Sequence, residues 1–325
     1  MKNDLKNNLK KYKHFLFFSI IIIIFISSLI STNNYYRELE KKGNYNIYRD
    51  VSYAIEEGIS YDIKYNLLDV YTPKEIPEDT LLPVVIFVHG GAWTDFFGNK
   101  NNKKNSILKS IYFTDRNFIL VTVNYRVFPE VKFPVYIQDV TKGIEWVYEN
   151  IENYSGNKNL IFLQGHSAGA QIISLISTDE SYLKENNLDL NVIKGTILLE
   201  GIGYDILKSK LFDVDGQIIN KYLMFSFGED DETLKKASSI NYISEDKGIP
   251  PMIIFSAENS LFRIGKIESL DFYLKLINND VYAEHYIVKG KTHFTLHSDF
   301  GEEDDFTTKR TIDFLERIIE RRIVR

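Results

Sequence analysis

The chain of 325 residues contains no cysteine, and this absence excludes several kinds of chemistry at once. The protein has no disulfide scaffold, no cysteine-ligated zinc or iron–sulfur site and no thiol nucleophile. Proline is scarce, with seven residues, which excludes a proline-rich architecture. The formal net charge of −6 argues against a general nucleic-acid-binding protein. The chain is long enough to bury a full hydrophobic core, and 44% of its residues are hydrophobic.

The N-terminus combines a basic stretch with an apolar run. Residues 1–14 include five lysines and one aspartate, and residues 15–30 carry no charge. This order is typical of a secretion signal or of a signal anchor whose basic flank stays in the cytoplasm. We therefore expect residues 15–32 to be a signal anchor or signal peptide, followed by a linker over residues 33–47. The remainder would then be exported and attached to the membrane through this segment.

From residue 48 to residue 325, strand-like and helix-like patterns alternate. Short, dense apolar runs typical of buried strands occur at residues 83–88, 118–123, 160–163, 192–199 and 252–255. Helical spacing of apolar residues lies between or after them, at residues 139–151, 170–176, 267–277 and 311–323. This alternation predicts an α/β domain with a mainly parallel central sheet flanked by helices.

The segment Gly165-His166-Ser167-Ala168-Gly169 follows one predicted strand and precedes a predicted helix. A G-x-S-x-G sequence in this position is typical of a nucleophile elbow, which presents a serine on a sharp, strained turn. The glycines are needed because residues two before and two after the serine have almost no space for a side chain. Ser167 is therefore the candidate nucleophile.

A second glycine-rich turn, His89-Gly90-Gly91-Ala92-Trp93, follows the predicted strand at residues 83–88. Acyl transfer places negative charge on the carbonyl oxygen, and backbone N–H groups must stabilise it. We expect this oxyanion hole to be formed by Gly90, Gly91 and Ala92 together with Ala168, which follows the nucleophile.

These motifs are accompanied along the chain by Asn124-Tyr125-Arg126, Pro129, Phe133-Pro134 and Asp139. The set resembles the α/β-hydrolase superfamily over residues 50–325. It is similar to the esterase/lipase branch that includes hormone-sensitive-lipase-like carboxylesterases, feruloyl and acetylxylan esterases and kynurenine formamidase. The resemblance implies an α/β-hydrolase fold, an insertion over residues 205–247 between strands six and seven that caps the active site, and hydrolysis that requires no cofactor or metal.

The resemblance also bears on the catalytic base. Among the six histidines, His293 lies in Thr292-His293-Phe294, which is similar to the histidine loop of the superfamily. We therefore prefer His293 to His297 as the group that accepts the serine proton.

The third member of the triad, the acidic residue that pairs with the histidine, departs from the pattern of the superfamily. Asn259 stands where members of the superfamily carry aspartate after strand seven. Three interpretations are open. Glu258 turns inward and serves as the acid, Asp205 after strand six serves instead, or only Asn259 is available and the enzyme is slow or inactive. Our preferred triad is Ser167, His293 and Glu258.

The expected function is that of a serine hydrolase that cleaves a carboxylic ester or a small aryl amide through an acyl-serine. Phe262 and Arg263 match the formamidase-like pattern and make an aryl formamide an alternative substrate. The competing class is a non-catalytic binding protein on the same fold, for which Asn259 is the motive. Cleavage of a thioester or peptide by the same triad is a further alternative.

Overall fold

The computed structural model describes residues 40–41, 43–53, 65–95, 106–211, 217–260 and 262–321. The chain divides into two units, residues 1–43 and 44–325, and the architecture below belongs to the second. The expected signal segment, residues 15–32, lies outside the described residues. Within the described ranges, no helix combines the length and the apolar character needed to cross a membrane.

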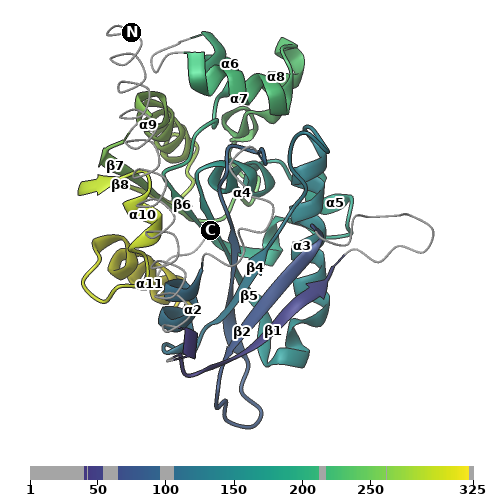
Figure 1. Ribbon diagram of the computed structural model, residues 1–325, viewed down its shortest axis with the longest axis vertical. Helices are drawn as coiled ribbons and strands as arrows, with labels where there is room; N and C mark the ends of the chain where they lie inside the picture. The colour runs from purple at the N-terminus through teal and green to yellow at the C-terminus, as the bar shows by residue number, and fades with distance from the viewer. Residues whose placement is uncertain are drawn as a thin grey trace, which may run out of the picture. The chain divides into compact units, whose positions relative to one another are not determined.

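An eight-stranded sheet forms the centre of the domain, in the order β1-β2-β4-β3-β5-β6-β7-β8 (Figure 1). The first two strand pairs in this order are antiparallel and all the others are parallel. The strands are β1 (Tyr45–Ser52), β2 (Leu67–Pro73), β3 (Leu82–Val88), β4 (Ile119–Val123), β5 (Gly156–His166), β6 (Ile193–Leu199), β7 (Met252–Asn259) and β8 (Ala283–Thr292).

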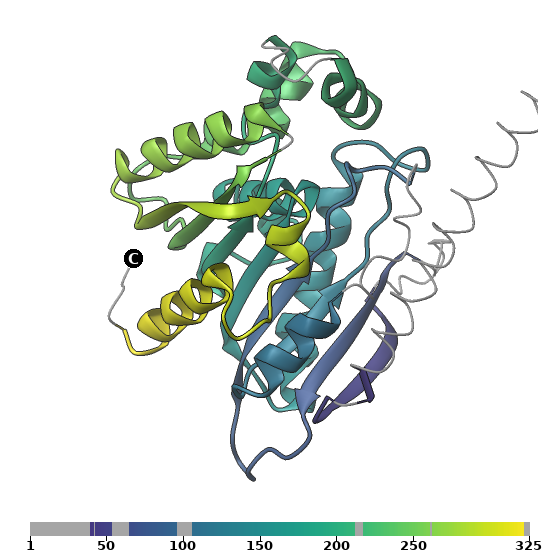
Figure 2. The same ribbon diagram turned by 60° about the vertical axis from the view of Figure 1, so that its left-hand side comes forward.

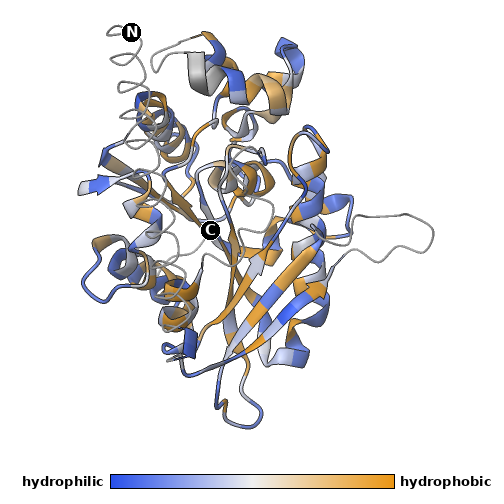
Figure 3. Cartoon of the chain, viewed as in Figure 1, coloured by the Kyte–Doolittle hydropathy of each residue, from blue (hydrophilic) through white to orange (hydrophobic). Residues whose placement is uncertain are grey.

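Helices cover both faces of this sheet (Figures 1 and 2). Helices α2 (Ile107–Thr114) and α11 (Phe306–Ile319) pack on one face, where Phe87, Phe113 and Phe314 join one buried cluster. Helices α3 (Val135–Asn150), α4 (Ala168–Thr178) and α9 (Arg263–Ile277) pack on the other. The inner strands are apolar along most of their length, as strands buried on both faces require (Figure 3).

An insertion of short helices separates β6 from β7 and lies at the top of Figure 1. It contains α6 (Ile206–Leu211), α7 (Gln217–Phe227), α8 (Asp231–Ala237) and the 3₁₀ turn η4 (Ser239–Tyr242). The remaining short elements are η2 (Ile151–Tyr154), α5 (Ser181–Lys184), η3 (Leu190–Val192) and α10 (Thr295–Ser298). The predicted fold, a mainly parallel sheet with an insertion at this point, is therefore confirmed.

Two elements differ from the sequence-based expectation. Strand β1 begins at Tyr45, inside the segment expected to be a linker. It is an edge strand with half-buried and exposed positions, so it lacks the dense apolar run that marked the inner strands. Helix α2 was not expected either.

Candidate active site

Ser167 lies in the sharp turn between β5 and α4. Its backbone has φ 55° and ψ −120°, a combination that is strained for a residue with a side chain. A Cβ on Gly165 would lie 2.5 Å from the Gly169 carbonyl oxygen, and one on Gly169 would lie 2.2 Å from the Val88 carbonyl oxygen. The two glycines are therefore required by the close approach of backbone on both sides of the serine.

The glycine-rich loop after β3 packs directly against this turn. A Cβ added to Gly90 would lie 2.9 Å from the Cβ of Ser167. Gly91 and Ala92 both have positive φ, 137° and 54°, so the loop turns sharply in front of the serine. Ala168 is the first residue of α4, and the first N–H groups of a helix have no acceptor within the helix. Backbone from the two expected donor segments therefore converges on Ser167.

His293 lies in the turn after β8, and its residue is only 5% exposed. Its carbonyl oxygen lies 3.0 Å from Nε2 of His166, the residue before Ser167. The edge of the Phe262 ring packs against the imidazole, with the ring centroids 4.8 Å apart. The histidine turn is therefore fixed beside the nucleophile turn.

The carboxylate beside His293 belongs to Glu200, the first residue after β6. Its Oε1 lies 4.0 Å from His293 Nδ1, and both residues are buried. Neither of these two atoms has a hydrogen-bond partner in the described part of the chain. The other carboxylate oxygen accepts a hydrogen bond from the Ala257 N–H. The nucleophile, a buried imidazole and a buried carboxylate thus come together at the carboxyl ends of β5, β8 and β6.

Comparisons with known proteins identify the family to which this chain belongs. A model of the BD-FAE family matches residues 68–262, which is more than half of the chain. The chain belongs to the BD-FAE family. It is therefore a member of the esterase/lipase branch of the α/β-hydrolase superfamily, as the sequence motifs predicted.

Relatives of this BD-FAE family member include an isoprenylcysteine alpha-carbonyl methylesterase of Arabidopsis thaliana. It is 30% identical over 261 residues, which cover 75% of this chain and 58% of that protein. Esterase LipQ of Mycobacterium tuberculosis is 28% identical over 198 residues, covering 59% and 45%. The chain thus spans 58% and 45% of the length of these two relatives. The crystal structure of esterase B from Lactobacillus rhamnosis shares the fold, with a TM-score of 0.70, 17% identity and coverage of 91% and 94%.

The acid candidates taken from the sequence lie elsewhere in this BD-FAE domain. Glu258 is exposed, and its carboxylate accepts a hydrogen bond of 2.9 Å from the Gly290 N–H. Asn259 is exposed at the end of β7, opposite Thr292. Asp205 accepts a hydrogen bond from the Lys208 N–H in the first turn of α6. In the described part of the chain, the carboxylates of Glu258 and Asp205 bind other groups, and the carboxylate opposite His293 is that of Glu200.

Sequence reasoning missed Glu200, although a usable signal was present. It is the first residue after the predicted strand at residues 192–199, at the carboxyl end where parallel strands present functional groups. Asp205, the candidate expected after strand six, follows the same strand but binds the Lys208 N–H, whereas Glu200 lies opposite His293.

Burial shifts the protonation of both members of the pair. It lowers the pKa of His293 to about 4. Burial raises the pKa of Glu200, whereas hydrogen bonds from Ser260 and the Ala257 N–H lower it. At neutral pH the imidazole is therefore uncharged and able to accept a proton.

Aromatic residues connect the oxyanion loop to the insertion. The Trp93 indole N–H donates to Gln171 Oε1 at 3.0 Å, and its ring contacts Phe227 of α7 edge-on, with centroids 5.0 Å apart. The Phe133 N–H donates to the Ser226 carbonyl at 2.9 Å. Helix α7 therefore packs on the loop that carries the expected oxyanion donors.

Other features of the surface are separate from this site. An open depression of about 460 Å³ lies between α6, α8 and η4, and its lining does not include Ser167 or His293. Among the residues the structure describes, no group of three or more histidine, aspartate or glutamate side chains is placed to hold a metal ion.

Proposed function

We propose that this BD-FAE family member is a serine carboxylesterase with Ser167 as nucleophile, His293 as base and Glu200 as acid. The observation that carries the proposal is the buried Glu200 carboxylate opposite His293 Nδ1, beside a strained serine. The separation of 4.0 Å is longer than a hydrogen bond, and catalytic contacts are often longer in enzymes without substrate. Pairing would satisfy two buried atoms that otherwise have no partner.

The reaction follows from these positions. Ser167 Oγ attacks the ester carbonyl while His293 Nε2 accepts its proton, and Glu200 stabilises the imidazolium through Nδ1. Backbone N–H groups of Gly91, Ala92 and Ala168, with Gly90 as a further donor, bind the oxyanion. The imidazolium then protonates the leaving alcohol, which leaves an acyl-serine. Water attacks the acyl-serine, His293 takes the water proton, and the acid is released as Ser167 is regenerated.

For the substrate we propose an ester with an apolar acyl part. Phe294, next to His293, is 64% exposed, and an apolar group at this place suits an apolar substrate. The names of the relatives, methylesterase and carboxylic ester hydrolase, support an ester over an aryl formamide. We also propose, on the sequence of residues 1–32 alone, that the protein is exported and attached to the membrane.

The competing proposal, a non-catalytic binding protein, rested on Asn259 as the group nearest the histidine. Glu200 removes this reason for expecting an inactive protein, because its carboxylate lies opposite His293. The strained backbone of Ser167 also favours catalysis, since such strain is typical of functional sites.

The test uses the full chain, a fluorophosphonate probe and 4-nitrophenyl butyrate, beside Ser167→Ala. We expect rapid labelling and turnover that fall by about 10⁴ or more in the variant. Equal hydrolysis by the two proteins would refute the proposal. An N-formyl anilide in the same assay tests the formamidase alternative, because only a formamidase would cleave it faster than the ester.

A further inference from the structure

His166, directly before the nucleophile, contacts two other loops of the site. Its Nε2 lies 3.0 Å from the His293 carbonyl oxygen, which can only accept a hydrogen bond, so Nε2 carries the proton. On the other side, a Cβ added to Gly90 would lie 3.1 Å from His166 Nδ1. One buried side chain therefore lies between the histidine turn and the oxyanion loop.

The His166 ring is also one of three neighbouring imidazoles. Its centroid is 4.8 Å from that of His293 and 4.7 Å from that of His297, which stacks on it at 20°. The far side of the series is closed by Phe87 of β3, stacked on His297 at 5.5 Å. The ring of His293 thus packs against His166, the ring of His166 stacks on His297, and His297 stacks on Phe87 of the sheet.

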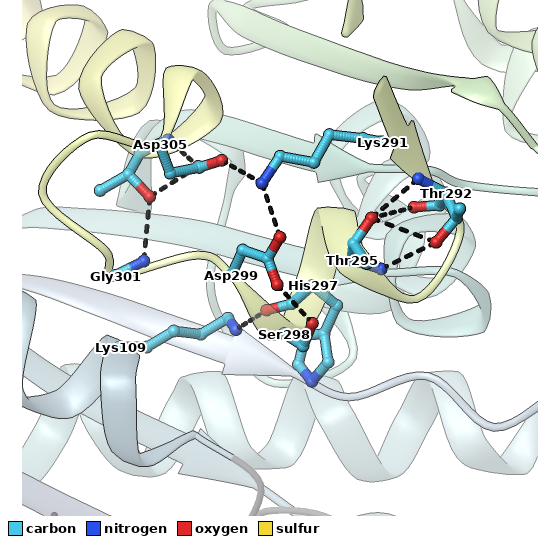
Figure 4. A network of polar contacts seen from close by, with 10 residues as sticks. Lys109, Lys291, Thr292, Thr295, His297, Ser298, Asp299, Gly301 and Asp305 are labelled. Carbon is cyan, nitrogen blue, oxygen red and sulfur yellow. Dashed lines mark hydrogen bonds and ion pairs between the residues drawn. The ribbon is translucent and has the colours of Figure 1, made fainter. Parts of the chain in front are cut away.

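A buried lysine contacts the other end of the histidine turn (Figure 4). Lys109 of α2 is 2% exposed and donates to the His297 carbonyl oxygen at 2.6 Å. Lys291 pairs with Asp299 at 2.8 Å and with Asp305 at 2.7 Å, on the two sides of the loop that follows α10. The turn that carries His293 is therefore held by the ion pairs of Lys291 at one end and by the hydrogen bond from Lys109 at the other.

Within the turn, Thr292 and Thr295 bind each other reciprocally. The Thr292 N–H donates to Thr295 Oγ1 at 2.8 Å, and the Thr295 N–H donates to Thr292 Oγ1 at 3.2 Å. These two hydrogen bonds fix the backbone conformation of residues 292–295. The orientation of the turn relative to the rest of the domain depends on contacts with other elements. Those contacts include the hydrogen bonds from His166 and Lys109 and the packing of Phe262 on His293.

We propose that His166 is a positioning residue for His293, with His297 and Lys109 as its support. By donating to the His293 carbonyl and packing beside its ring, His166 sets the distance between the base and Ser167. Burying polar rings and a lysine costs folding free energy that an apolar core of the same shape would not cost. The benefit of these residues would be the correct position of the base, because a displacement of about 1 Å in a catalytic group lowers the rate about 100-fold. The inference rests on the proposed esterase function.

The test compares three replacements of His166 in the full chain. His166→Gln keeps an N–H donor at about the position of Nε2, His166→Asn keeps a polar group only near Nδ1, and His166→Phe keeps the ring without a donor. We expect kcat near the parent value for Gln and about 100-fold lower for Asn and Phe, with KM changed much less. The kcat of His297→Phe, which keeps the stacked ring, should lie between that of His166→Gln and those of His166→Asn and His166→Phe.

His285→Gln is the control, because His285 is a half-buried histidine of the same sheet whose ring binds Ser256 at 3.0 Å, outside this series. Its kcat should stay within about twofold of the parent. A second readout needs no activity. With six histidines in the chain, ¹⁵N NMR of labelled histidine should show His166 as the Nε2–H tautomer.

The outcomes separate the two proposals. If the parent enzyme reacts with the fluorophosphonate and Ser167→Ala does not, the proposed function stands whatever the His166 variants do. Folded Asn and Phe variants with parental kcat, or an Nδ1–H tautomer at His166, would then overturn the positioning role alone. If the Asn and Phe variants do not fold, the Gln variant and the tautomer decide.

Discussion

The carboxyl ends of β6 and β7 lie side by side, yet of the two only the end of β6 places a carboxylate opposite His293 in the described part of the chain. Leu199 pairs with Phe255, so Glu200 lies at the level of Ser256 and is buried. Glu258 and Asn259 extend further along β7 and are exposed. The two strand ends thus differ in the burial of their glutamates, and the proposed acid is the buried one, although Glu258 is closer to His293 along the chain.

The end of β7 still contributes to the site, but as a support. The Ala257 N–H donates a hydrogen bond to one oxygen of Glu200. Beyond β7, helix α9 supplies Glu268, which accepts hydrogen bonds from the N–H groups of Gly203 and Tyr204 in the loop after Glu200. The chain after β7 therefore fixes the loop that carries the acid.

The sharpest test of this comparison exchanges the two glutamates for glutamine. Glu200→Gln should lower kcat by about 10³ to 10⁴, because an amide cannot stabilise the imidazolium by charge. Glu258→Gln should keep kcat within about twofold of the parent value, because the side chain of Glu258 lies at the surface. Steady-state kinetics of both variants on one ester is the measurement. A large loss in Glu258→Gln with none in Glu200→Gln would reverse the assignment.

A second prediction concerns stability and the loop after Glu200. Burial raises the pKa of Glu268 to about 8 from an ordinary value of 4.5, so the folded state keeps a proton that the unfolded state releases. The stabilisation is complete below pH 4.5 and is lost as the pH rises through 8. The free energy of unfolding should therefore fall by at most about 1.4 kcal/mol per pH unit between these values.

Glu268→Gln is the matched variant for this effect, because its amide resembles the protonated acid and can still bind the two N–H groups and Ser209. Urea unfolding at pH 5 and pH 9 should show a smaller difference for the variant than for the parent. If the unfolding free energy changed equally between the two pH values in parent and variant, the retained proton would belong to a group other than Glu268.

A third prediction is the acid limb of kcat/KM. Activity should fall as His293 becomes protonated, at a pH below the ordinary histidine pKa of 6.5, because burial lowers the pKa of His293. The Glu200 carboxylate opposes this shift, so Glu200→Gln should move the limb to still lower pH. Glu258→Gln should leave it in place. A limb that moves upward in Glu200→Gln would contradict contact between the two groups.

The smallest effect is expected at Asn259. Restoring the aspartate of the superfamily pattern with Asn259→Asp should change kcat by no more than about twofold, because the position is exposed and Glu200 already serves His293. The same ester assay measures it. A gain of tenfold or more would show that β7 supplies the acid after all.

Much of the molecule could be predicted from local patterns. The inner strands are dense apolar runs, and the turn at Ser167 needs glycines that the sequence shows on both sides. Strand β1 was harder, since its exposed residues at the sheet edge resemble a linker. Helix α2 had no expected counterpart, and its buried Lys109 looks from the sequence like an ordinary surface lysine.

The sequence by itself determined the fold class, the nucleophile turn and the glycine-rich loop, because each depends on residues close together in the chain. The choice of carboxylate was decided only by the tertiary structure. Glu200, Asp205 and Glu258 all satisfy the order of serine, acid and histidine along the chain. The register of β6 against β7 buries Glu200 at His293 and leaves Glu258 in solvent, and that register is set by long-range strand pairing.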